Sequence, residues 1–315
     1  MSRARRFADK GNLHSLVLNA TDGSATDAGD KVLLDGTDTS ASNSGFTILL
    51  EDATGNADVR ITSQLENGIF NFDMLRKVSL FPKRFYFKDF IDDYSDLKKV
   101  SQYWINAQKK INSDNKIKIL KTHNGNYNFL GKDFTNKQNT LGVIYVVRDP
   151  RNIIASISNH YQLNTEQSVN FLLDEKRFLF NENDPNDLTE ENIITLLGSW
   201  KAHYNSWKIS SNLIIIRYED LLLNTELEIE KLSKFIKKFI SFEVDDKKIQ
   251  NILKNTSFDK LKKMEEKEGF EESSNTNIKF FNLGPKNNWK DVLNEKLIHD
   301  IEKNFHKEMK ELRYI

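Results

Sequence analysis

The chain has 315 residues, which is enough for one large domain or two modest ones. It carries 46 basic and 46 acidic side chains, so its formal net charge is zero and nucleic-acid binding along the whole chain is disfavoured. It contains no cysteine, which excludes disulfides and thiolate sites. No apolar run approaches the roughly 18 residues of a membrane helix, and the basic N-terminus lacks the apolar region of a secretory signal. We therefore expect a soluble, cytoplasmic protein with no nucleic-acid or membrane partner, or a virion component made in the cytoplasm.

Residues 1–60 form a leader rich in Gly, Ala, Ser, Thr and Asp. Apolar triplets recur sixteen residues apart, each followed by an acidic, polar tract: Leu16-Val17-Leu18, Val32-Leu33-Leu34 and Ile48-Leu49-Leu50. This pattern predicts a small β array, or an adhesive segment that orders only on assembly, while a disordered tail is the alternative. It resembles repeat-bearing leader segments of marine phage structural proteins, which implies virion attachment or self-association through this region.

Residues 61–315 are richer in Lys, Asn, Ile, Phe and Leu, and we expect them to form a second domain. Hydrophobic periodicity predicts buried strands at 116–123, 143–147 and 212–220. It predicts helices over residues 70–81, 97–111, 150–161, 166–176, 190–210, 225–239, 245–255 and 292–312. A capping box, Thr225 with Glu228, is expected to open one of them. Strands separated by helices indicate a three-layer α/β/α fold with a parallel sheet.

The stretch 141–161 joins an apolar strand to an amphipathic helix through the turn Arg148-Asp149-Pro150-Arg151. The N-terminus of a helix is electropositive and its first N–H groups have no intrahelical partner. With Arg148 and Arg151 beside it, this turn suits a phosphate, and the Ser156 hydroxyl adds a donor. The alternative is an Arg–Asp pair that merely closes the loop.

All three predicted strands end in polar residues, which should meet at one edge because ligands of open α/β sheets bind beyond the carboxyl ends of the strands. His123 is the candidate proton acceptor because imidazole titrates near neutrality. Lys121 lies two residues earlier, on the same face of the strand, where it would stabilise negative charge on a leaving group. The alternative for His123 is a surface histidine at a strand end.

Five motifs in order resemble the sulfotransferases that use 3′-phosphoadenylyl sulfate (PAPS). They are Lys121-Thr122-His123, the turn at 148–151 with Ser156, Tyr218-Glu219-Asp220, Thr256-Ser257-Phe258 and the segment 280–290. The resemblance covers residues 65–312 and implies the sulfotransferase fold, which is similar to that of P-loop NTPases.

The resemblance also implies a role for each matching residue. His123 matches the base that deprotonates an acceptor hydroxyl, and Lys121 matches a basic residue near the transferring group. The matching donor-binding residues are Arg148 and Ser156 for the 3′-phosphate, Tyr218, Thr256 and Phe258 around the adenine, and Gly284 in the loop that closes on the 3′-phosphate. The implied reaction is in-line sulfuryl transfer from PAPS to a hydroxyl of a carbohydrate or small molecule, without a metal.

The sequence departs from the family where the 5′-phosphosulfate loop and its strand are expected. No such loop is found, and the acidic repeats stand in its place. Two interpretations follow: a sulfotransferase whose catalysis is crippled, or a virion-associated or carbohydrate- or nucleotide-binding protein on a degenerate sulfotransferase fold. A kinase is disfavoured because no Gly-x-x-x-x-Gly-Lys loop occurs. Since the missing strand is normally central in the sheet, we expect exposed strand edges and poor stability unless a leader segment fills the gap.

Overall fold

The fold is described from a computed structural model of the chain. The structure describes side chains within residues 80–114, 117–180, 192–240, 249–250, 256–269 and 279–315 and at 253, and the backbone of residue 79 and of three leader strands. The main sheet contains β1 (His14–Asn19), β4 (Ser79–Leu80), β5 (Lys118–Thr122), β8 (Gly142–Val147) and β11 (Leu213–Arg217). The other strands pair as β2 (Thr47–Glu51) with β3 (Asp58–Thr62), β6 (Asn128–Phe129) with β7 (Lys132–Asp133), and β9 (Phe178–Leu179) with β10 (Thr195–Leu196). The helices are α2 (Arg84–Phe87), α3 (Leu97–Gln102), α4 (Trp104–Ile111), α5 (Pro150–Tyr161), α6 (Thr165–Leu173), α7 (Trp200–Lys208), α8 (Tyr218–Leu223), α9 (Thr225–Ile236), α11 (Phe258–Glu268) and α12 (Glu295–Glu311).

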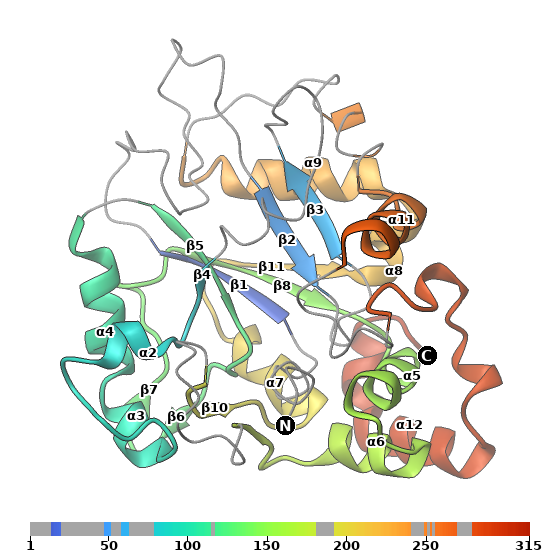
Figure 1. The fold of residues 1–315 in the computed structure, drawn as a ribbon, viewed down its shortest axis with the longest axis horizontal. Helices are drawn as coiled ribbons and strands as arrows, with labels where there is room; N and C mark the ends of the chain where they lie inside the picture. Colours follow the sequence, from blue (N-terminus) through green and yellow to red (C-terminus); the bar gives the residue numbers. More distant parts are fainter. Residues whose placement is uncertain are drawn as a thin grey trace.

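The main sheet has the strand order β11-β8-β1-β5-β4 (Figure 1). β4 is parallel to β5, and β11 is parallel to β8. β1 is antiparallel to both β5 and β8, so these two strands run parallel to each other. The α/β fold with parallel strand pairing is therefore confirmed, and the carboxyl ends of β4, β5, β8 and β11 share one edge. The expectation of a wholly parallel sheet is wrong at its central strand.

Helices cover both faces of this sheet because its inner strands are apolar on both sides. Every residue of β8 is buried. Val143, Tyr145 and Val147 belong to the larger core with α4, α5, α6, α7 and α12, whereas Ile144 and Val146 belong to a second core with α8 and α9. Successive side chains of a strand point to opposite faces, so one strand serves both cores.

A leader strand occupies the middle of the sheet. β1 contains the first apolar triplet, and its register places Val17 beside Leu120 and Val143 and places Ser15 beside Thr122. β2 contains the third triplet but pairs with β3, and the second triplet lies outside the described residues. The position expected to be empty thus receives a strand from residues 1–60, although it runs opposite to its neighbours.

Several predicted helix boundaries are wrong. The helix expected over 70–81 lies mostly outside the described residues, and its end is the edge strand β4, where the Phe81 N–H donates to Lys121 O and Pro82 follows. The helix expected at 190 begins at Trp200, because Gly198 adopts φ +73° and Ser199 caps the helix. The expected strand at 212–220 ends at Arg217, and helix α8 begins at Tyr218.

The helix expected at 225 does begin at Thr225, but the predicted capping box does not form. Asn224 is the N-cap residue and makes no side-chain capping bond. The Thr225 hydroxyl instead donates to Leu221 O of the preceding helix. The helix expected over 245–255 lies almost wholly outside the described residues.

The strand-turn-helix at 141–161 is confirmed. β8 ends at Val147 and α5 begins at Pro150, with Asp149 as its N-cap residue. The Asp149 carboxylate accepts a hydrogen bond from Arg151 N at 2.9 Å. A capping carboxylate followed by Pro in the first helical position fixes the start of the helix, which aims its N-terminus along the carboxyl edge of the sheet.

Candidate donor-binding site

Two predicted site residues meet where β8 and β11 end. Arg148 follows β8, and Tyr218 follows β11. Both side chains are at most 2% exposed, and the Arg148 guanidinium carbon lies 4.4 Å from the centre of the Tyr218 ring. Parallel pairing of the two strands brings these neighbours together, and the aromatic face orients the cation. The arrangement provides a fixed positive charge at the sheet edge.

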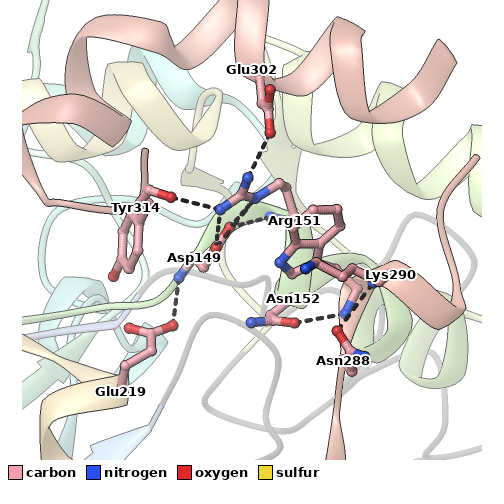
Figure 2. A network of polar contacts seen from close by, with 9 residues as sticks. Asp149, Arg151, Asn152, Glu219, Asn288, Lys290, Glu302 and Tyr314 are labelled. Carbon is pink, nitrogen blue, oxygen red and sulfur yellow. Dashed lines mark hydrogen bonds and ion pairs between the residues drawn. The ribbon is translucent and has the colours of Figure 1, made fainter. Parts of the chain in front are cut away.

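Glu219 holds the turn that carries Arg148. Its Oε1 accepts a hydrogen bond from Asp149 N at 2.9 Å, which joins the ends of the two strands (Figure 2). Burial raises the pKa of the Glu219 carboxyl, while the bond from Asp149 and the charge of Arg148 partly offset that effect. Sequence reasoning missed this role, although Glu219 lies inside one of the motifs.

Arg151 has a different function from the one predicted. Its guanidinium forms a fork with Asp149, reaches Glu302 Oε1 at 2.5 Å and donates to Tyr314 O at 2.8 Å (Figure 2). It also lies over the Trp289 ring at 4.3 Å. Because two carboxylates already neutralise this cation, Arg151 fastens helix α5 to α12 and the C-terminal residues instead of supplying charge for a phosphate. The expected alternative of an Arg–Asp pair that closes the loop therefore describes Arg151.

Helix α5 also holds the segment 284–290. Asn152 Oδ1 accepts a hydrogen bond from Trp289 N at 3.0 Å, and Asn152 O accepts one from Asn287 Nδ2 at 2.7 Å. Figure 2 shows Asn152 beside Asn288 and Lys290 of this segment, in the first turn of α5. The start of α5 is therefore a joint between the Arg148 turn and the closing segment. No sequence signal singled out Asn152, which is one Asn among many in this chain.

Two further predicted residues are in contact: Gly284 of this segment and Phe258, the first residue of α11. Gly284 has φ +52°, and a Cβ added there would lie 2.6 Å from Phe258 Cδ2 and closer still to other ring atoms. The ring also packs edge-on against Phe281 at 6.1 Å. The Glu265 carboxylate of α11 accepts hydrogen bonds from Phe280 N at 2.6 Å and from Phe281 N at 3.0 Å. The site thus needs glycine at 284 both for its backbone conformation and for the approach of the Phe258 ring.

Ser156 and Thr256 have less defined settings. Ser156 lies one turn beyond Asn152 on α5 and is fully buried. It therefore stands on the helix that links the Arg148 turn to the closing segment. Thr256 is half-buried two residues before Phe258.

The predicted catalytic residues lie at the end of β5. Lys121 is in the strand and His123 follows it directly, and both are less than 8% exposed. Asn124 fixes the next turn, because its Oδ1 accepts from Leu196 N at 2.8 Å and its carbonyl from Trp207 Nε1 at 3.1 Å. His123 is thus a buried residue and not the surface histidine of the alternative. β1 separates β5 from β8, so His123 and Arg148 end strands about 10 Å apart along the same edge.

Within the described residues, no group of three or more His, Cys, Asp or Glu is placed to hold a metal ion. None of the helices in this part of the chain combines the length and apolar character needed to cross a membrane.

The sequence profile described as "Sulfotransferase domain" matches residues 63–313, which is most of the chain. The chain belongs to the sulfotransferase family. The strand-turn-helix with Arg148 and the segment with Gly284 both lie inside the matched range.

Comparisons with individual proteins cover smaller parts. The luciferin sulfotransferase of Photinus pyralis is 28% identical over 148 residues, which are 46% of this chain and 35% of that protein. The alignment thus spans about a third of this relative's length. A mouse sulfotransferase, SULT7A1, solved with PAP, has a TM-score of 0.38 and 20% identity over 53% of this chain and 57% of its own. Retinol dehydratase, solved with androsterone and the inactive cofactor PAP, has a TM-score of 0.34 and 19% identity over 53% of this chain and 47% of its own.

Proposed function

We propose that this sulfotransferase-family chain transfers a sulfuryl group from PAPS to a hydroxyl of a carbohydrate or small molecule. The observation that carries the proposal is the pairing of Arg148 with Tyr218, joined through α5 to the Gly284 and Phe258 contact. A buried cation on an aromatic ring, a helix N-terminus and a glycine cradle suit an adenine nucleotide with a phosphate. Arg148 and Ser156 would hold the 3′-phosphate, and Tyr218, Thr256, Phe258 and Gly284 would surround the nucleoside.

PAPS supplies an activated sulfuryl group, and the residues at the end of β5 would serve the acceptor. His123 would take the proton of the acceptor hydroxyl, and Lys121 would stabilise the negative charge that develops as the group moves. Burial of both residues near the sheet edge limits access of water to the proton transfer. A small-molecule acceptor agrees with the name of the Photinus pyralis relative.

A second candidate function is nucleotide or carbohydrate binding without transfer. The direction of β1 favours this function. β1 lies between β5 and β8 and is antiparallel to both, so its first residue, and not its last, lies at the edge where the other strands carry the candidate site. A phosphosulfate loop follows the carboxyl end of a strand, so this central position cannot present one in the usual way. We place a leader at 1–60, with self-association or virion attachment as its role, before a cytoplasmic sulfotransferase domain at 61–315.

The test is transfer of labelled sulfate from PAPS to a panel of hydroxyl acceptors. Activity that His123→Ala abolishes, with binding of the product PAP retained, supports the enzyme. PAP binding without turnover by the wild-type chain supports the binding protein. Absence of both turnover and PAP binding contradicts both candidates.

A further inference from the structure

The two halves of the proposed donor site come from distant parts of the sequence. Arg148 and Ser156 belong to the turn and helix after β8, whereas Gly284 belongs to the segment before α12. Two hydrogen bonds join these parts at the first turn of α5, where Asn152 accepts one through its side chain and another through its backbone. The closing segment is therefore tied to the helix whose N-terminus would face the phosphate.

We propose that Asn152 is a positioning residue that holds the segment 284–290 against α5, so that the nucleotide-binding half of the site exists before the donor arrives. This inference rests on the proposed function only for the identity of the ligand. The Asn152 side-chain oxygen satisfies the first free N–H of the short helix that starts at Trp289, and its carbonyl satisfies the Asn287 amide. Two bonds from one residue fix both the position and the direction of the segment.

Neighbouring groups strengthen the attachment without replacing it. The Arg151 guanidinium carbon lies 4.3 Å from the centre of the Trp289 ring. Asp149 and Glu302 in turn hold this guanidinium (Figure 2). Asn159, two turns further along α5, reaches Lys279 O only at 3.4 Å and on the exposed surface. Asn152 is thus the better-placed of these two asparagines to set the register of the segment, and Asn159 provides a matched control.

Tryptophan fluorescence gives a direct measure of the attachment. Of the four tryptophans in the sequence, Trp104, Trp200 and Trp207 are fully buried, and Trp289 is half-buried. Acrylamide quenching in the full-length chain therefore reports mainly on Trp289. We expect Asn152→Ala and Asn287→Ala to raise the quenching constant, and Asn159→Ala to leave it at the wild-type value. Asn152→Asp, which keeps the acceptor oxygen for Trp289 N, should restore low quenching.

Calorimetric titration with PAP measures the consequence for the site. Loss of one such hydrogen bond should weaken PAP binding about threefold to tenfold in Asn152→Ala, with no change in Asn159→Ala. If Asn152 had a purely structural role, Asn152→Ala would lower the thermal midpoint of the chain both without and with PAP and would leave the PAP affinity unchanged.

Equal quenching in wild type, Asn152→Ala and Asn287→Ala would overturn the inference, and so would increased quenching with unaltered PAP affinity. If the wild-type chain binds no PAP at all, the proposed function fails, and the quenching series alone still decides whether Asn152 holds the segment.

Discussion

The Phe258 ring packs directly against Gly284 in the candidate site, and Gly284→Ala perturbs this contact with one methyl group. The residue has φ +52°, where an L side chain costs about 1–2 kcal/mol. The added Cβ would also lie 2.6 Å from Phe258 Cδ2 and nearer to other ring atoms, so the ring or the segment must move. Overpacking of this kind costs about 1–3 kcal/mol more.

The matched control is Gly131→Ala, in the turn between β6 and β7. Gly131 has φ +80°, and no heavy atom lies within 4 Å of its added Cβ, so the control places a methyl group at positive φ without the contact. For a domain of this size each kcal/mol lowers the thermal midpoint by about 2–4 °C. Gly284→Ala should therefore unfold several degrees below Gly131→Ala.

The affinity for PAP should also differ between the two glycine variants. Moving Phe258 disturbs a proposed adenine contact, so PAP affinity should fall by about tenfold or more in Gly284→Ala and stay unchanged in Gly131→Ala. Phe258→Leu in the Gly284→Ala background should recover part of the lost midpoint, because the smaller side chain makes room. Equal midpoints and equal PAP affinities for the two glycine variants would refute the reasoning.

Three further predictions concern the network and the sheet. Arg151→Lys should lower the thermal midpoint by several degrees, because a single ammonium cannot replace the fork to two carboxylates and the C-terminal carbonyl; a midpoint equal to wild type would count against it. Burial raises the pKa of Glu219 above its ordinary 4.5, so the folded chain holds this proton more tightly than the unfolded chain does. The stability that the Glu219 carboxyl contributes therefore falls as the pH rises above 4.5. The thermal midpoint of Glu219→Gln minus that of the wild type should accordingly increase between about pH 4 and about pH 7. A difference that stays constant over this range would contradict the prediction. Ser15→Cys with Thr122→Cys should form a disulfide in this cysteine-free chain because the two residues are paired, whereas Asn19→Cys with Thr122→Cys, about 13 Å apart, should not.

The sequence was sufficient for elements whose signals are local. The apolar run of β8, the capping Asp149 and Pro150 specify a strand, a turn and a helix within 21 residues, and the structure confirms all three. The start of α7 also has a local signal, because Gly198 breaks the chain direction and Ser199 caps the helix, although the helical periodicity upstream predicts a start at residue 190.

Features that depend on contacts between distant parts of the chain could not be predicted from the sequence. The triplet at 16–18 predicts a short strand, but its position between β5 and β8 and its antiparallel direction depend on pairing with residues more than 100 positions away. The roles of Arg151 and Asn152 likewise depend on partners near the C-terminal end of the chain, such as Trp289 and Glu302. A lone Arg or Asn in a turn carries no local sign of which distant group it will meet.

Calorimetric titration of the full-length chain with PAP tests the central claim, that the ends of β8 and β11 and the segment 284–290 form a nucleotide site. The account predicts saturable binding that Arg148→Ala weakens by at least about tenfold, since hydrogen bonds to charged groups contribute about 1.5–3 kcal/mol. Arg177→Ala, which removes a partly exposed arginine paired with Asp174, should bind PAP as wild type does. Absence of binding by the wild-type chain, or equal affinity in Arg148→Ala, would contradict the account.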